Sequence, residues 1–324
     1  MKLSKKKSID FKDVNLLSTQ PSVINSRDEI SFNKNRIIAA PMSAIMGKSF
    51  VKNAILSGIS LPIHRFNTID EQIELLDIAI EQKKLINSNS IIWLAVGLKD
   101  YKKRIESSLT ILRDNHIGIL LDVANGFHEE VENVVKQINK YELPNLFIGN
   151  IHTIQGWKFL ENINSKFIRV GIGNGAACST TTQTGIGRGQ ITIIDEIFCD
   201  YGFGNAAIVS DGGIKTPGDA AKAFGAGAEY IMIGSMFSYA REAECNINGQ
   251  NVFYGGASAF AKKLIGLPEK NIEGEAVAIQ QDKIKSLDAI VSDICDGIKS
   301  CISYSGYTRI EDFIGNAVFE TKQK

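Results

Sequence analysis

The stretch IIWLAVGLKDYKKRIESSLTILRDNHIGILLD, residues 91–122, carries the pattern on which the fold prediction rests. It opens with the apolar run Ile91–Val96 and closes with the run Gly118–Asp122, and the helix-length segment Ser107–His116 lies between them. Near-continuous hydrophobic runs of this kind are typical of parallel strands that are buried on both faces. The stretch therefore predicts one strand–helix–strand unit.

The same alternation recurs along the chain. Thr68–Lys84 and Glu129–Lys140 are further helix-length segments, and six more β-rich apolar runs complete a set of eight. These six runs are Arg36–Ala40, Ile59–Ile63, Leu146–Gly149, Phe167–Gly171, Ala207–Asp211 and Tyr230–Gly234. Eight strands that alternate with helices predict an α/β fold, a closed (β/α)8 TIM barrel, with an open doubly wound sheet as the alternative.

The segments outside this alternation predict how the single domain is completed. Residues 1–35 precede the first strand and are expected to form an N-terminal cover, and residues 36–324 are expected to form the barrel. The glycine-rich stretch Ala243–Ile279 is less regular, which favours a flap over the C-terminal face of the barrel. Leu287–Ser305 repeats its apolar residues near a 3.6-residue period and predicts a C-terminal helix.

Composition excludes several classes of protein. The 324 residues include 36 Lys and Arg and 36 Asp and Glu, which argues against a chain-wide charged face for nucleic acid or anionic lipid. No apolar run approaches the roughly 20 residues of a membrane span, and the basic N-terminus lacks the apolar stretch of a signal peptide. We therefore expect a cytoplasmic protein without nucleic-acid or membrane partners. The five cysteines form no CxxC pair, so zinc and disulfide frameworks are not expected.

The most informative segment is GIGNGAACSTTTQTGIGRGQ, residues 171–190, which we call the Cys loop. Its glycines allow the backbone to approach a ligand closely, and successive free N–H groups can bind an anion. Cys178 lies inside it among hydroxyl side chains, and a thiolate suits attack at an electron-poor carbon. The alternative is a buried, inert cysteine, which this context disfavours for Cys178. The remaining cysteines lack such a context and are expected to be structural: Cys199, Cys245, Cys295 and Cys301.

Glycine-rich turns follow the seventh and eighth predicted strands. They are Asp211-Gly212-Gly213 and Gly234-Ser235. The loops at these positions commonly hold phosphate in barrels of this class, and Asp211 could accept hydrogen bonds from ribose hydroxyls. The alternative is tight-turn chemistry combined with a helix N-cap.

The order of these motifs resembles the IMP dehydrogenase/GMP reductase family. The resemblance rests on LDVANG (121–126), GN-x-x-T (149–153), the Cys loop, SDGG (210–213), GDAAKAFGAGA (218–228), FYGG (253–256) and EG (273–274), and it covers nearly the whole chain. Two features favour the GMP reductase branch. One is DVANGF (122–127), and the other is the lack of room for the regulatory module that the dehydrogenases usually insert.

The resemblance implies an NADPH-dependent reductive deamination of GMP. Cys178 would attack C2 of the purine nucleotide, ammonia would leave, hydride would be delivered to C2, and IMP would depart. Thr180 and Glu273 would handle the proton transfers. The implied substrate-binding residues are Met42, Gly175, Asp211, Gly213, Gly234, Ser235, Gly255 and Gly256. The implied cofactor-binding residues are Asp122, Asn125, Gly126, Asn150 and Thr153. Backbone carbonyls of Gly173, Gly175 and Cys178 would hold a potassium ion, and the chain would form a homotetramer.

Several positions depart from the family pattern. They are Ser43, Arg65, Ala176, Thr181, Gly189, Gly256 and Ala257. Loss of a hydroxyl at Ala176 is expected to weaken phosphate binding, by about 1–3 kcal/mol. The changes at 256–257 are expected to enlarge the base pocket, which would suit an altered guanine nucleotide.

Other activities and roles stay open at this point. An IMP dehydrogenase that lacks the regulatory module, a catalytically silent nucleotide-binding relative and a flavin-dependent barrel are the alternatives. Among the histidines, His64 and His152 are expected near the mouth of the barrel, and His116 and His128 in packing or surface positions.

Overall fold

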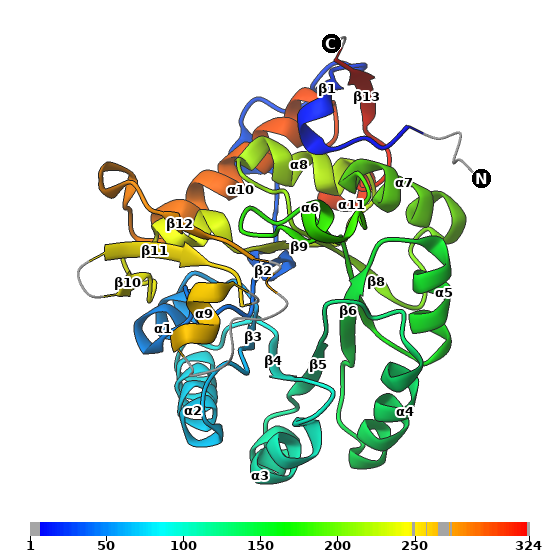
Figure 1. Cartoon of the computed structure of the whole chain (residues 1–324). Coiled ribbons are helices and arrows are strands. Elements are labelled where there is room, and N and C mark those ends of the chain that lie inside the picture. Colours follow the sequence, from blue (N-terminus) through cyan, green and yellow to red (C-terminus); the bar gives the residue numbers. More distant parts are fainter. Residues whose placement is uncertain (1–6, 248–249, 257, 265–271, 273, 323–324) are drawn as a thin grey trace.

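The computed structural model describes residues 7–322, apart from 248–249, 257, 265–271 and 273, and contains the predicted parallel barrel (Figure 1). All eight predicted strands are present, with bounds that differ from the sequence prediction by at most two residues. They are β2 (Ile37–Ala39), β3 (Leu61–Ile63), β4 (Ile92–Val96), β5 (Gly118–Asp122), β6 (Phe147–Ile151), β7 (Phe167–Val170), β8 (Ala207–Asp211) and β9 (Tyr230–Ile233).

The sheet is a closed barrel, not the open alternative. The strand order is β2-β9-β8-β7-β6-β5-β4-β3, with parallel pairing throughout. A parallel bridge between Ile38 and Ser60 joins the two ends, through Ala39 N to Ser60 O (2.9 Å) and Ser60 N to Ile37 O (2.9 Å). The C-terminal strand ends therefore form one rim, where the site of such a barrel is expected.

Large aromatic side chains fill the interior of the barrel. The rings of Trp93, Phe147 and Phe167 contact one another, with centroids 5.2–5.7 Å apart. Trp93 is fully buried, and its Nε1–H donates to Asn145 O (3.0 Å), so its polar group keeps a partner. The interior is thus packed with side chains, and a ligand is expected at the rim.

Helices cover the outside of the barrel. Between or after the strands lie α1 (Lys48–Leu56), α2 (Ile69–Ile86), α3 (Tyr101–Asp114), α4 (Glu129–Ile138), α5 (Ile154–Asn162), α7 (Gln190–Tyr201), α8 (Pro217–Gly225), α10 (Leu287–Tyr304) and α11 (Ile310–Phe313). Capping boxes at Thr68 and Thr216 begin α2 and α8, because each threonine accepts a backbone N–H of the first turn. No helix among the described residues has the length and apolar character needed to cross a membrane.

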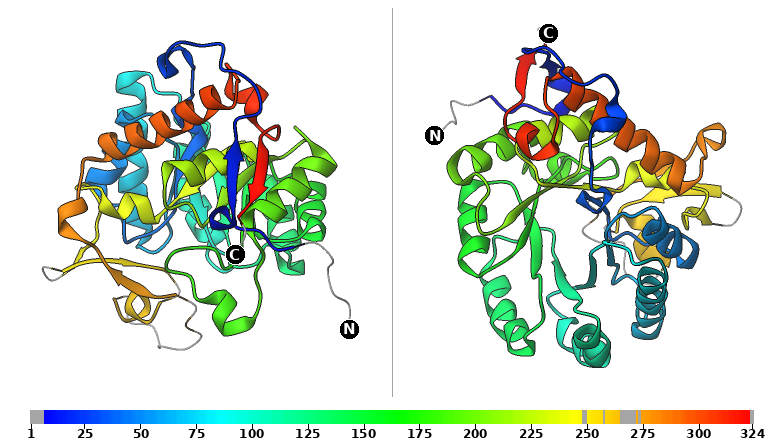
Figure 2. Two further views of the ribbon diagram at one scale, coloured as in Figure 1. Left: turned by 90° about the horizontal axis from the view of Figure 1, so that it is seen from above. Right: turned by 180° about the vertical axis from the view of Figure 1, so that it is seen from behind.

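The N-terminal segment is fixed by the C-terminus and by the Cys loop. Strand β1 (Val14–Leu17) pairs antiparallel with β13 (Val318–Thr321), and the two lie side by side in both views of Figure 2. Gln190 N donates to Asp10 Oδ1 (2.9 Å), and Gly189 N donates to Ser8 Oγ (2.6 Å). The predicted boundary at residue 35 stays a prediction.

The flap, Ala243–Ile279, contains more regular structure than its sequence predicts. It includes a three-stranded antiparallel sheet of β10 (Asn246–Ile247), β11 (Gln250–Tyr254) and β12 (Ala276–Ala278), and the short helix α9 (Ala259–Leu264). Tyr254 pairs with Ala276 in this sheet, and its side chain is buried. The sheet leads directly into the Gly255–Gly256 turn at the pocket described below.

Replacing Trp93 with alanine tests the packing of the barrel interior. Loss of this fully buried ring is expected to lower the free energy of unfolding by about 3–5 kcal/mol, because the cavity left behind can collapse only in part. Urea denaturation followed by circular dichroism measures the change. Leu85→Ala is the matched control, since Leu85 is 79% exposed and its loss should change stability by less than about 0.5 kcal/mol.

Candidate functional site

A pocket of about 270 Å³ lies at the C-terminal rim of the barrel, between the strand ends and the flap. Most of the residues predicted for the site line this one pocket. They are Met42, Asn150, Gly173, Gly175, Cys178, Thr180, Asp211, Gly213, Gly234, Ser235, Gly255 and Gly256. The sequence argument thus selected residues from six separate segments of the chain that the fold brings together.

The other predicted residues lie elsewhere. Asn125 accepts the N–H of Phe127 (3.1 Å), and Thr153 is the N-cap of α5 and accepts the N–H of Gly156 (3.1 Å). Asp122 and Gly126 do not line the pocket, although Gly126 N donates to Asn150 O (2.7 Å) and Asp122 pairs with Arg169. Glu273 and Ala257 lie outside the described residues.

Backbone geometry fixes both ends of the Cys loop. Gly171 has φ +137°, and a Cβ there would stand 2.1 Å from Asp211 O, so only glycine fits. At the far end, the buried side chain of Gln190 donates to Val170 O (2.6 Å) and Ser210 Oγ (3.1 Å). Its Oε1 accepts from Asn174 Nδ2 (2.7 Å) inside the loop. The loop is therefore tied back to β7 and β8 at its base.

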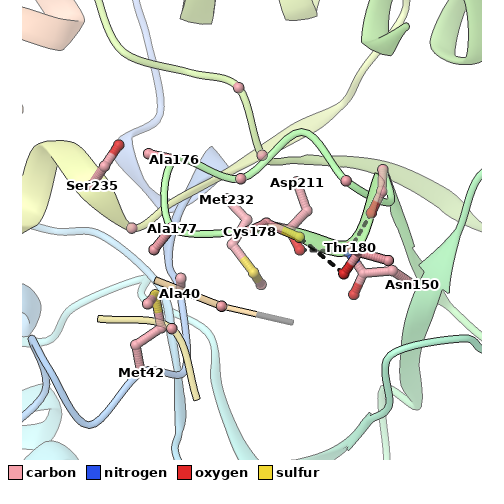
Figure 3. Close-up of a pocket in the computed structure, with 18 of the residues that line it drawn as sticks. Ala40, Met42, Asn150, Ala176, Ala177, Cys178, Thr180, Asp211, Met232 and Ser235 are labelled. Atoms are coloured by element: carbon pink, nitrogen blue, oxygen red, sulfur yellow. Dashed lines mark hydrogen bonds between the residues drawn. The ribbon is translucent and has the colours of Figure 1, made fainter. Parts of the chain in front are cut away.

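Cys178 stands at the pocket wall beside a hydroxyl group. Its Sγ–H donates to Thr180 Oγ1 at 3.2 Å, and both residues are half-buried (Figure 3). Thr180 begins the short helix α6 (Thr180–Thr184), which sets its side chain next to the sulfur. Figure 3 shows this pair on the same side of the pocket as Asn150, with Ala176 and Ser235 on the opposite side. We call the side of the pocket with Cys178 and Thr180 the sulfur end, and the side with Ser235 and the glycine turns the glycine–serine end.

The flap pairs with the backbone of the Cys loop at Cys178. Gly274 forms an antiparallel bridge with Cys178 and a parallel bridge with Ser258, and Glu275 N donates to Ala177 O (2.9 Å). A nucleophile that is enclosed in this way is partly shielded from bulk water, which strengthens electrostatic interactions inside the pocket.

The other four cysteines differ from Cys178 in their surroundings. Burial raises the pKa of Cys245 to about 12, and those of Cys295 and Cys301 to about 11. Cys245 Sγ also donates to Ala44 O (2.8 Å), and Cys199 lies exposed on α7. These three thiols, of which Cys301 is half-buried, therefore stay protonated at neutral pH, which supports their predicted structural role.

A buried arginine that sequence reasoning missed joins two of the predicted carboxylates. Arg169 on β7 pairs with Asp122 (Nη1–Oδ1 2.5 Å) on β5 and with Asp211 (Nη2–Oδ2 2.9 Å) on β8. Asn150 Nδ2 donates to the same Asp211 oxygen (2.7 Å), and Arg65 Nε contacts Asp122 (3.3 Å). Burial alone would lower the pKa of Arg169, but the two carboxylates outweigh it and raise that pKa, so the guanidinium stays charged. The network fixes the orientation of Asp211 at the pocket.

Two departures from the family pattern have a local explanation. A Cβ at Gly256 would lie 2.8 Å from the ring of Phe66, so this ring takes part of the space that a larger side chain would occupy. A Cβ at Gly189 would lie 2.4 Å from the Ile9 backbone nitrogen, and proline would also lose the N–H that binds Ser8. The Phe66 ring therefore limits the enlargement of the base pocket that the change at Gly256 is expected to cause.

The histidines do not line the pocket. His64 is buried, with Nε2–H donating to Met46 O (3.2 Å) and Nδ1 accepting the N–H of Phe66 (3.1 Å). Burial lowers the pKa of His64 to about 4, and burial together with Arg188 lowers the pKa of His152. His128 caps α4. Among the described residues, no group of three or more His, Cys, Asp or Glu is arranged to hold a metal ion.

Protonation of His64 predicts a loss of stability on acidification. The unfolded state binds a proton near pH 6.5 and the folded state only near pH 4, so stability is full above 6.5 and falls between these values. The loss is on the order of 3 kcal/mol at the acid end of this window. Urea unfolding at neutral pH and near pH 4 measures it. In His64→Asn the difference between the two pH values should shrink, and an unchanged difference would contradict the assignment.

Comparison with known proteins agrees with this geometry. A family model described as the IMP dehydrogenase / GMP reductase domain matches residues 9–324. A GMP reductase of Streptococcus equi subsp. zooepidemicus is 31% identical over 318 residues, which cover 93% of this chain and 91% of the relative. GMP reductases of Streptococcus pneumoniae serotype 4 and Buchnera aphidicola subsp. Acyrthosiphon pisum are 30% and 29% identical, covering 94% and 98% of this chain and 92% and 95% of their own lengths. The matches span the barrel, the Cys loop and the flap, and the chain belongs to the IMP dehydrogenase / GMP reductase family.

Proposed function

We propose that the chain catalyses the NADPH-dependent reductive deamination of GMP to IMP and ammonia, through a covalent bond between Cys178 and C2 of the purine. The observation that carries this proposal is the placement of the Cys178 thiol beside Thr180 Oγ1 (3.2 Å), in a pocket whose other end is built from glycine turns. Relatives named GMP reductase support the direction of the reaction.

The substrate is oriented by the two ends of the pocket. Backbone N–H groups around Gly213, Gly234 and Ser235 suit the phosphate, because the loops after the seventh and eighth barrel strands commonly hold one. Asp211 is held by Arg169 and Asn150 through Oδ2, and no described residue donates to its Oδ1. That second oxygen suits ribose hydroxyls. A nucleotide placed in this way directs its base toward Cys178.

The proposed reaction proceeds through a covalent bond between the Cys178 thiol and C2 of the purine. Cys178 gives up its proton and adds to C2, and the 2-amino group takes up a proton and leaves as ammonia, which gives a thioimidate. Addition of hydride at C2 and cleavage of the C–S bond then release IMP and the thiolate. Thr180 is next to the sulfur and we assign it to the proton transfer, with Glu273, the residue before Gly274 in the sequence, as its partner.

A nicotinamide cofactor fits the side of the pocket that Ala124 and Asn150 form. Ala124 contributes only a methyl group to the lining of the pocket, and Figure 3 shows Asn150 on the same side as Thr180 and Cys178. NADPH, when bound, would supply the hydride for C2. We also assign Asp122, Asn125, Gly126 and Thr153, which do not line the pocket themselves, to the cofactor site.

The remaining expectations from the resemblance stay proposals. A potassium ion would use the carbonyls of Gly173, Gly175 and Cys178. Gly175 O already accepts Cys178 N–H (3.1 Å), which leaves it a second lone pair for a cation. Activity in potassium compared with sodium buffers tests this site. A cytoplasmic homotetramer is likewise proposed, and light scattering of the purified protein tests the oligomeric state.

Turnover of GMP with NADPH tests the reaction. Loss of absorbance at the NADPH band and ammonia release should both occur with GMP, while IMP and NAD⁺ should give no NADH. Cys178→Ala should lower turnover by roughly 10⁴-fold or more and leave GMP affinity within about threefold of wild type. Thr180→Val should lower kcat by about 10²–10⁴-fold.

Cys199→Ala is the matched control, since this exposed thiol on α7 lies outside the pocket. It should keep wild-type activity. Full activity in Cys178→Ala would end the covalent proposal. NADH formation from IMP would assign the chain to the dehydrogenase reaction instead.

A further inference from the structure

The first turn of α7, which follows the Cys loop, is capped by residues from the start of the chain. The helix begins after Gly189, which has no side chain to accept the free N–H groups of the first turn. Asp10 Oδ1 instead accepts the N–H of Gln190 (2.9 Å), across 180 residues of sequence. Ser8 Oγ accepts the N–H of Gly189 (2.6 Å), and Figure 1 shows this segment, in blue, beside α7. A distant segment thus supplies the cap that the helix lacks locally.

Backbone contacts hold the same segment against the helix. Ile9 N donates to Thr192 Oγ1 (2.8 Å), and Thr192 N donates to Ile9 O (3.3 Å). Thr192 Oγ1 in turn donates to Lys7 O (3.0 Å). A Cβ at Gly189 would lie 2.4 Å from Ile9 N, so glycine lets the two backbones touch. We call residues 7–11 the cap segment, because they pack on the first turn of α7.

The last residue of the cap segment reaches the other end of the pocket. Phe11 is buried, and a Cβ at Gly213 would lie 3.4 Å from its ring, so the ring packs behind the turn that lines the glycine–serine end. Lys222 Nζ on α8 donates to Phe11 O (2.8 Å) and fixes the backbone at this point. The cap segment therefore contacts both the base of the Cys loop and the turn proposed for the phosphate.

Asp10 supplies the charged contact of this set. A carboxylate at the N-terminus of a helix is stabilised by the helix dipole and by a charge-assisted hydrogen bond. Its own backbone is fixed, because Asp10 N donates to Asp13 Oδ2 (3.1 Å). The N–H that Asp10 accepts belongs to Gln190, whose buried side chain binds Asn174 inside the Cys loop (2.7 Å). A short series of contacts thus connects Asp10 to the loop that carries Cys178.

We propose that Asp10 is a positioning residue for the reaction at Cys178. By capping α7 it holds Gln190, and through Gln190 the Cys loop, in the arrangement that directs the thiol at a bound purine. Phe11 extends this effect to the phosphate turn, so that the cap segment keeps the two ends of the pocket at a fixed separation. This inference rests on the proposed function, because it takes the reaction at Cys178 as given.

Steady-state kinetics of the full chain with GMP and NADPH test the role of Asp10. Asp10→Ala is expected to lower kcat by about tenfold and to leave KM for GMP within about twofold, because a small displacement of the thiol slows the reaction more than it weakens binding. Asp10→Asn should keep kcat within about twofold of wild type, since asparagine caps helices as well as aspartate does.

Gly189→Pro disturbs the same contact from the helix side. The φ of −60° at Gly189 suits proline, but the new side chain would collide with the backbone of Ile9 and displace the cap segment. This variant should lower kcat by a similar factor. Asp10→Ala/Gly189→Pro should be no slower than the slower single variant by more than about twofold, because both changes release the same segment.

Hydrogen–deuterium exchange gives a readout that does not depend on turnover. In Asp10→Ala the backbone amides of residues 172–186 should exchange about fivefold faster than in wild type, and those of α2 should exchange at the wild-type rate. Asp200→Ala is the matched control, because it removes an exposed carboxylate from the other end of α7. It should change neither kcat nor the exchange of the Cys loop.

The outcomes distinguish this inference from the proposed function. Wild-type kcat and wild-type exchange in Asp10→Ala overturn the inference. Equal losses of kcat in Asp10→Ala and Asp10→Asn overturn it as well, because asparagine keeps the cap. Faster exchange in α2 to the same degree as in the Cys loop also overturns it, since that result marks a general loss of stability. If the wild-type chain turns over no GMP, the proposed function fails, and the exchange measurement still decides whether Asp10 holds the loop.

Discussion

The site depends on the way one buried amide holds the Cys loop against the barrel. Gln190 contacts β7 through Val170 O, β8 through Ser210 Oγ and the loop itself through Asn174. A buried primary amide that uses both donors and its acceptor is costly to displace, because each lost partner leaves an unsatisfied polar group. The loop can therefore consist of glycines and small residues and still present Cys178 in one place.

Arg169 on β7 holds the C-terminal ends of β5 and β8 in place through its ion pairs with Asp122 and Asp211. A buried cation is expensive by itself, and the two flanking carboxylates compensate for its desolvation. The same contacts hold Asp211 at the glycine–serine end of the pocket. The covalent chemistry and the binding of the nucleotide thus rely on two separate polar anchors, both buried at the base of the rim.

Much of the barrel could be predicted because its signal is local. Runs such as IIWLAV and GILLD are apolar throughout, and only a strand that is buried on both faces requires this. The β1–β13 pair could not be predicted, since about three hundred residues separate two short segments with no pattern of their own. The sheet in the flap could not be predicted either, because its strands are only 2–5 residues long and lie in a glycine-rich stretch.

The site was predictable where strand ends coincide with unusual residues, as at Asp211 and Cys178. Arg169 could not be predicted as a site residue, because it stands inside the apolar run FIRV, which predicts a buried strand. A lone arginine in a run that is otherwise buried is a usable signal, because such a charge needs carboxylate partners. Thr153 also follows a strand, and its hydroxyl caps α5, while its part in cofactor binding stays a prediction.

The central claim is that Cys178, among five cysteines, is the one that bonds to a bound purine. Mass spectrometry of the intact protein after incubation with a purine nucleotide that carries a halide leaving group on the ring tests this claim directly. The account predicts a single added nucleotide, mapped by peptide sequencing to Cys178 and slowed by excess GMP. No addition, or addition at another cysteine that GMP does not slow, would contradict it.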